Sequence, residues 1–127
     1  MPERGSIEAR ELYALARRVR SSRLLVPEAF AALGRARRTG RLSSRGAARA
    51  LAGTCTLLAE IEPIELDAAL ADHAGELATE HGLRGYDAVH LASYELIETD
   101  TSVLVAADGE LVRAAKTIGH AVAVPGA

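Results

Sequence analysis

One uninterrupted apolar segment, Ser102–Ala107, constrains the fold more than any other part of this sequence. Polar and apolar residues do not alternate in it, which is typical of a strand buried on both faces of a sheet. Asp108 and Gly109 then predict a turn into a helix that reaches about Lys116, and a last short strand is predicted over residues 121–124. A strand, a helix and a second strand in this order favour an α/β fold with a mostly parallel sheet.

The remainder of the chain alternates between helical periodicity and short apolar runs. Short strands are predicted over Arg23–Val26 and Ile61–Leu66, the second near a sheet edge because Pro63 cannot donate to a ladder. Apolar residues at helical spacing, with start and stop signals, predict the following helices. They run from about Ile7 to Arg20, from Pro27 and Glu28 to about Gly40, from a cap at Ser43 or Ser44, from a cap at Asp67 to a stop at Gly82, and from Asp87 to about Ile97.

Size and composition are those of an ordinary globular domain. The chain has 127 residues, of which 49% are hydrophobic and 25% charged, and we expect a single domain over residues 1–127. No apolar run approaches the roughly 18 residues that span a bilayer, and the first ten residues have no signal-peptide pattern, so a cytoplasmic protein without membrane contact is expected. Cys55 is the single cysteine, so the chain cannot form an internal disulfide. We predict that Cys55 lies on the core side of a helix.

Charge is distributed unevenly along the chain. Residues 1–59 contain twelve arginines and four glutamates, whereas residues 60–127 contain three basic and thirteen acidic residues. A basic half and an acidic half suit a polyanion bound near a carboxylate site, although solvated helix faces would give the same distribution. Four arginines form a basic helix end that would suit RNA phosphates, an acidic partner or the helix dipole: Arg35, Arg37, Arg38 and Arg41.

Three acidic residues stand where predicted helices begin. Glu28 and Asp108 each follow a predicted strand, and Asp87 follows the turn 82–85. Ligands of open parallel sheets bind beyond the carboxyl ends of the strands, so these carboxylates are expected to converge there. Carboxylate oxygens suit Mg²⁺ or Mn²⁺, yet an acid in a first helical turn also stabilises the helix without any catalytic role. For Asp67 we adopt that structural interpretation.

Three ordered segments resemble a known family. Leu83–Ala92, with its Tyr-Asp-Ala-Val-His-Leu-Ala run, and Ala107–Leu111 are similar to the second half of VapC-type PIN-domain ribonuclease toxins. Ser22–Ala36 is similar to the strand-to-helix segment that precedes them in that family. The resemblance covers nearly the whole chain and depends on the order and spacing of all three segments.

This resemblance implies a PIN-like three-layer α/β/α domain and the toxin component of a type II toxin–antitoxin module. Its expected activity is endoribonuclease cleavage of RNA phosphodiester bonds by water activated on Mg²⁺ or Mn²⁺. Glu28, Asp87 and Asp108 fall on acidic positions of the family's site and are the implied catalytic residues and metal ligands. The resemblance also implies a homodimer and a cognate antitoxin whose tail lies across the acidic groove.

Two departures from the family pattern keep a second function open. The family's central first strand, which ends in an additional site aspartate, has no counterpart in the opening Pro-Glu-Arg-Gly-Ser, and Ala106 replaces a frequent threonine. The alternative is therefore a truncated, catalytically weak or inactive PIN domain that dimerises and binds an antitoxin. Near Asp87, His90 is interpreted as a packing or dimer-contact residue, and Tyr86 and Tyr94 as half-buried core.

Overall fold

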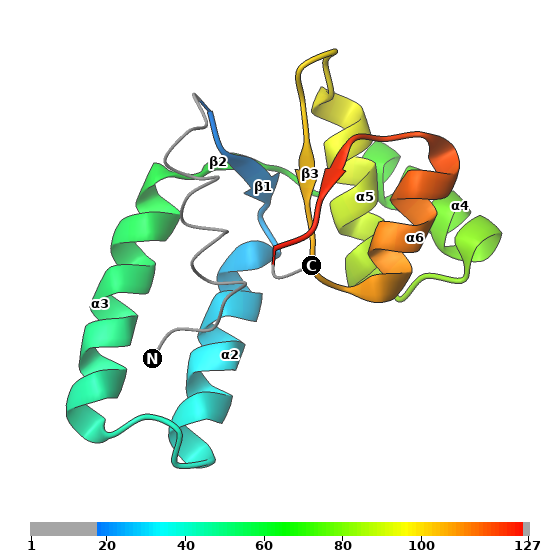
Figure 1. The fold of residues 1–127 in the computed structure, drawn as a ribbon. Coiled ribbons are helices and arrows are strands. Elements are labelled where there is room, and N and C mark those ends of the chain that lie inside the picture. Colours follow the sequence, from blue (N-terminus) through cyan, green and yellow to red (C-terminus); the bar gives the residue numbers. More distant parts are fainter. Residues whose placement is uncertain (1–17, 126–127) are drawn as a thin grey trace. The chain divides into compact units, whose positions relative to one another are not determined.

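The computed structural model of the chain describes residues 18–125, which belong to two compact units (Figure 1). The first unit, Arg18–Glu65, contains β1 (Arg20–Ser22), α2 (Leu25–Arg38), α3 (Ser44–Glu60) and β2 (Glu62–Ile64). The second, from Leu66 on, contains α4 (Ala68–His81), α5 (Gly85–Ile97), β3 (Leu104–Val105), α6 (Gly109–Ile118) and β4 (Val122–Ala123). The prediction of a single domain over residues 1–127 remains a prediction.

In the first unit, a helical hairpin connects two parallel strands. Strand β1 pairs with β2 in the register that places Ser22 opposite Ile64, and these are the two buried residues of the pair. The backbone N–H of Arg23 donates to the carbonyl of Ile64 at 3.0 Å, which extends the ladder beyond β1. Parallel strands need a crossover connection, and here α2 and α3, which pack against each other, provide it.

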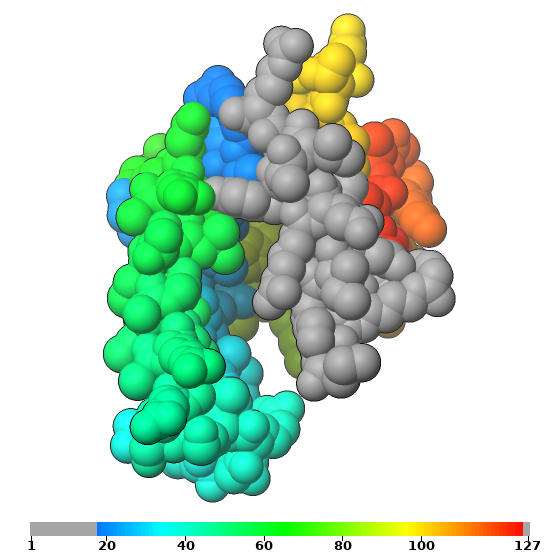
Figure 2. All heavy atoms as spheres, turned by 60° about the vertical axis from the view of Figure 1, so that its left-hand side comes forward, coloured from blue at the N-terminus to red at the C-terminus, as the bar shows by residue number. Residues whose placement is uncertain are grey.

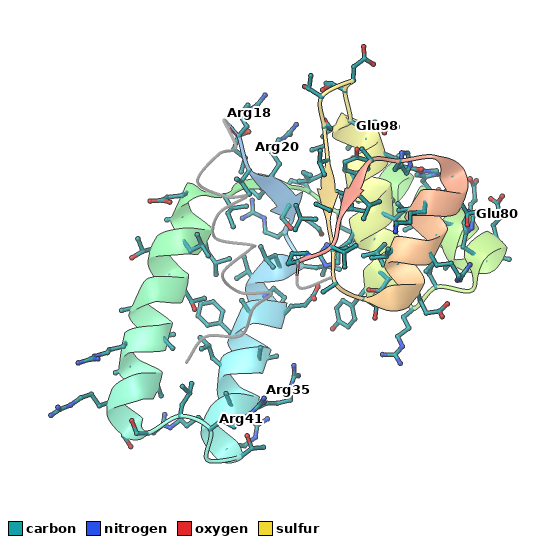
Figure 3. All side chains as sticks on the ribbon, in the orientation of Figure 1. Arg18, Arg20, Arg35, Arg41, Glu80 and Glu98 are labelled. Atoms are coloured by element: carbon teal, nitrogen blue, oxygen red, sulfur yellow. The ribbon has the colours of Figure 1, made fainter. Side chains whose placement is uncertain are left out.

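Ion pairs cross from the first strand to the second. Arg18 Nη2 lies 2.6 Å from Glu62 Oε2, Arg20 Nε lies 3.5 Å from the same oxygen, and Arg23 pairs with Glu65. Figure 3 labels Arg18 and Arg20 where the chain enters β1. Hydrogen bonds and charge from Arg18 lower the pKa of Glu62 despite some loss of hydration. The arginines at and beside β1 are therefore each paired with a glutamate at or beside β2.

The second unit contains the main hydrophobic core. Asp67 caps α4 by accepting from the N–H of Leu70 at 2.8 Å, and Gly82 ends the helix at a φ of +66°, so both predicted signals are confirmed. Leucine and alanine side chains of α4, α5 and α6 fill the core, and the small alanines let the helices approach closely. The fully or nearly fully buried members are Leu70, Ala74, Leu77, Leu83, Ala88, Leu91, Ala92, Leu111, Ala114 and Ala115.

Strands β3 and β4 are parallel and joined by α6, as the sequence predicts, but β3 is shorter and less buried than expected. Of Ser102–Ala107 only two residues form the strand, and Val103 and Val105 are about half exposed (51% and 48%). Within residues 18–125, β3 pairs with β4 alone, and only the face of Leu104 and Ala106 packs on the helical core. The prediction of burial on both faces is therefore wrong for the described part of the chain.

Other predictions need correction in the first unit. The strand predicted over Arg23–Val26 is instead β1, three residues earlier, because Leu25 and Val26 already belong to α2. Arg20, predicted to end a helix that began at Ile7, is the first residue of β1, and residues 7–17 lie outside the described range. Cys55 is exposed, since α3 has no buried residue. None of the described helices is long and apolar enough to cross a bilayer.

A polar clasp formed by His73, Glu95 and His120 connects three segments of the second unit. Glu95, on α5, places one carboxylate oxygen 2.6 Å from Nε2 of His73 on α4. Its other oxygen lies 2.6 Å from Nε2 of His120, which follows α6. His120 Nδ1 also lies 3.0 Å from Glu98, and its ring meets Tyr94 edge to face at 5.1 Å. Burial disfavours the charged carboxylate, yet the hydrogen bonds from His120 and His73 prevail and lower the pKa of Glu95.

We predict that Glu95→Gln destabilises the protein by roughly 1–3 kcal/mol at pH 7, because two hydrogen bonds to a charged acceptor are weakened. The pKa of Glu95 is lower in the folded protein than the ordinary 4.5. Its stabilising contribution is therefore complete above that value and is lost as the pH falls through the folded-state pKa. Urea unfolding followed by circular dichroism between pH 7 and pH 3 measures both effects.

The matched control is Glu80→Gln, which removes the same charge from a side chain that is 72% exposed. The control should keep the wild-type unfolding free energy at pH 7 and the wild-type loss of stability in acid. Glu95→Gln should show a shallower acid-induced loss than both. Identical pH profiles for all three proteins would contradict a stabilising role of the clasp.

Candidate metal centre

The three predicted site acids all lie at helix starts, but in different units. Glu28 is a half-buried residue in the first turn of α2, in the first unit. It does not follow its strand directly as predicted, since β1 ends at Ser22 and α2 already begins at Leu25. Asp87 and Asp108 belong to the second unit, Asp87 in the first turn of α5 and Asp108 at the N-cap of α6.

Asp108 is the N-cap residue of α6. Its Oδ1 accepts a hydrogen bond from the backbone N–H of Leu111 at 3.0 Å, while the residue as a whole is exposed. Asp67 caps α4 with the same geometry, at 2.8 Å from the N–H of Leu70. The cap orients the Asp108 carboxylate with one oxygen, which leaves the second oxygen for another positive partner.

Asp87 is the third residue of α5 and is half-buried. The N-cap residue of this helix, Arg84, makes no side-chain capping hydrogen bond. Asp87 is thus the acid of the first turn, where the positive end of the helix dipole stabilises a carboxylate. Its position agrees with the predicted start of this helix.

Asp87 and Asp108 share one end of the second unit. In Figure 1, α5 and α6 both begin at the lower end of this unit, and the chain runs down from β3 to the start of α6. The two helices pack against each other, so their first turns are held in a fixed relation. This is the carboxyl end of the parallel β3–β4 pair, where ligands of α/β folds bind.

The donor chemistry of these two acids fits a hard divalent cation. Within residues 18–125, no three or more His, Cys, Asp or Glu side chains have positions that would hold one metal ion. Mg²⁺ is commonly held by only one or two carboxylates and keeps several water molecules, in contrast to the closed cages of structural zinc. Asp87 and Asp108 therefore suit an open site of the magnesium type, and a closed structural cage is not built in the described range.

Side chains near Asp87 differ in their exposure. His90, one turn further along α5, is half-buried. Tyr94 is buried, and its hydroxyl donates to the carbonyl of Ser102 at 3.0 Å, so its interpretation as a core residue is confirmed. Burial and the nearby Glu98 raise the pKa of Tyr94. Tyr86 is 58% exposed, and its interpretation as half-buried core is wrong because it lies on the outer side of the first turn.

Sequence reasoning missed two sets of residues. The clasp residues His73, Glu95 and His120 are 22 and 25 positions apart, and nothing in the local pattern connects them. Arg45 and Arg49 on α3 extend the basic set found at the end of α2. A signal for these arginines was present, since the sequence contains no acidic residue between Glu28 and Glu60.

Comparisons with known proteins place the chain in a family. The family model of the PIN domain matches residues 2–117. Two proteins of Mycobacterium tuberculosis, "Ribonuclease VapC45" from strain CDC 1551 / Oshkosh and "Ribonuclease VapC49" from strain ATCC 25618 / H37Rv, are each 41% identical to it over 103 residues. The matched region covers 81% of this chain and 72% of each relative. With parallel strands crossed by helices in both units, the chain belongs to the PIN-domain family and to its VapC type.

Proposed function

We propose that this protein is a metal-dependent endoribonuclease and the toxin of a type II toxin–antitoxin module. The observation that supports this most is the position of Asp87 and Asp108 at the starts of α5 and α6, which lie at the same end of the second unit. Similarity to two proteins named as ribonucleases supports the same reaction class. In this proposal the substrate is RNA, and the protein acts in the cytoplasm.

In this proposal Asp87 and Asp108 hold Mg²⁺ or Mn²⁺. Glu28 is the third ligand that the family resemblance implies. A bound divalent ion would supply a water of lowered pKa and charge stabilisation for the departing oxygen. The protein's own contribution is orientation. The hydrogen bond from the N–H of Leu111 restrains the Asp108 carboxylate, and the first turn of α5 restrains Asp87 near a helix N-terminus.

Apolar side chains of the first unit support protein partners. Neither α2 nor α3 has a buried residue, and Phe30, Leu51 and Leu57 are 38%, 47% and 44% exposed. Large apolar side chains exposed on a helical hairpin suit an interaction surface. We assign this surface to the cognate antitoxin, and the homodimer expected of the family would cover further apolar area.

The same apolar surface also supports the second candidate function, in which the protein is a PIN domain that binds partners and does not cleave RNA. The two functions differ in one measurable property, because only the nuclease requires carboxylate charge at Asp87 and Asp108. Substitutions of these residues therefore separate them.

We predict that Asp87→Asn lowers the rate of metal-dependent RNA cleavage at least about 100-fold, because an amide is a poor ligand for a hard cation. The matched control is Asp72→Asn, which makes the same change at an exposed aspartate of α4. Cleavage of a labelled RNA is measured with increasing Mg²⁺ and Mn²⁺, and Mn²⁺ affinity is measured by calorimetry. Equal rates for the wild type and Asp87→Asn would exclude Asp87 from the reaction and favour the binding protein.

A second prediction separates the capping role of Asp108 from its role as a ligand. Asparagine caps helices about as well as aspartate, so Asp108→Asn should keep the unfolding free energy within about 0.5 kcal/mol while cleavage is lost. Asp108→Ala should lose cleavage and, in addition, about 1 kcal/mol of stability. Urea unfolding and the cleavage assay are run on the same preparations.

Asp67 provides the control for this pair, because it caps α4 with the same hydrogen bond and is not a site residue. Asp67→Asn should leave both stability and cleavage unchanged, and Asp67→Ala should lower stability alone. Full activity in Asp108→Asn would show that Asp108 serves only as a cap.

A further inference from the structure

The turn between α2 and α3, with the adjoining ends of both helices, carries a dense group of arginines, which we call the arginine tip. Residues 35–49 contain six arginines and no acidic residue, and all six are exposed. Figure 3 shows Arg35 and Arg41 at the same end of the hairpin, and in Figure 2 no other described segment covers the atoms of this turn. The members are Arg35, Arg37, Arg38, Arg41, Arg45 and Arg49.

The arginine tip differs from the other described arginines of its unit, because no carboxylate of residues 18–125 pairs with it. Arg18 and Arg20 pair with Glu62, and Arg23 pairs with Glu65. Among residues 18–125, no member of the tip makes an ion pair; the guanidinium of Arg41 donates only to the hydroxyl of Thr39, at 3.3 Å. Mutual repulsion of these like charges is therefore uncompensated within the described part of the chain.

Helix electrostatics explain only half of the tip. Three arginines, Arg35, Arg37 and Arg38, lie in the last turn of α2, where cations meet the negative end of the helix dipole. Arg45 lies at the opposite kind of position, in the first turn of α3, which contains no acidic residue. A cation there is disfavoured by the dipole, so helix stability does not account for the whole group.

The chemistry of the arginine tip fits a phosphate backbone better than a protein surface. None of the large exposed hydrophobic residues of the described chain falls within residues 35–49. Protein interfaces usually have an apolar centre, which this tip lacks. Guanidinium groups, in contrast, form forked hydrogen bonds with phosphate and need no apolar contact.

The second unit cannot itself attract such a substrate. Its described residues 66–125 contain ten acidic and three basic residues, a net charge of −7. The first unit, residues 18–65, has nine arginines and four glutamates, a net charge of +5. A polyanion cut next to Asp87 and Asp108 needs positive charge from another part of the protein to offset this repulsion.

We propose that the arginine tip binds the phosphate backbone of the RNA substrate, with Arg41 and Arg45 at its centre. This inference rests on the proposed nuclease function for the identity of the substrate. It adds to the carboxylates a second set of residues, which holds RNA through sequence-independent phosphate contacts.

The test measures binding of a fluorescently labelled 20-nucleotide single-stranded RNA to the full chain by anisotropy, in EDTA and at several KCl concentrations. The double variant Arg41→Gln, Arg45→Gln should raise Kd about 10- to 30-fold near 0.1 M KCl, and it should reduce the slope of log K against log salt by about 1.4. Arg41→Lys, Arg45→Lys keeps the charge and should therefore keep the wild-type slope of log K against log salt. Lys116→Gln, on α6, should leave both Kd and slope near the wild-type values.

Because EDTA prevents metal-dependent cleavage, this result is independent of the cleavage assay. Loss of cleavage in Asp87→Asn together with unchanged RNA binding in Arg41→Gln, Arg45→Gln would support the nuclease and overturn the inference about the tip. Failure of the wild-type chain to bind RNA would overturn it as well. So would retained RNA binding in the double variant with loss of binding to a polyglutamate peptide, because the tip would then serve an acidic protein partner.

Discussion

The clasp of Glu95 between His73 and His120 is the interaction on which the geometry of the second unit depends. It connects α4, α5 and the segment after α6 through the two oxygens of one carboxylate. The core that surrounds it consists mainly of leucine and alanine, whose contacts are not directional. Hydrogen bonds of 2.6 Å supply the direction, and they fix how α5 and α6 lie against each other. The relative positions of Asp87 and Asp108, which lie at the starts of these two helices, therefore depend on the clasp.

Helix capping alone does not identify a site acid in this protein. Asp67 and Asp108 accept the same type of backbone hydrogen bond at nearly the same distance. They differ in what surrounds the cap. Asp108 follows β3 and shares one end of the unit with Asp87, whereas Asp67 begins α4 after the edge strand β2. The position at the carboxyl end of a parallel strand pair, together with the family segments, distinguishes a candidate ligand from a structural acid.

Local signals predicted the helices well, and tertiary context limited the strands. Asp67 and Gly82 act within one or two turns of the chain, so their roles as cap and stop follow from sequence alone, whereas the structure selects Ser43 over Ser44 as the cap of α3. The burial of Val103 and Val105 depends instead on which strand lies beside them. An apolar run in the sequence does not indicate which strand that will be. The same limit applies to the site: the sequence indicated that Asp87 and Asp108 begin helices, but a family resemblance was needed to group them with Glu28. The clasp joins residues too distant in sequence for any local pattern.

The basic and acidic halves of the described sequence correspond to the two structural units. Acidic residues concentrate in the unit that holds Asp87 and Asp108, and arginines without a carboxylate partner in residues 18–125 concentrate on the α2–α3 hairpin of the other unit. A nuclease needs carboxylates for its cation, and those same carboxylates repel the substrate backbone. Keeping the two charges on separate elements allows each to act on its own partner, the carboxylates on a metal ion and the arginines on phosphate.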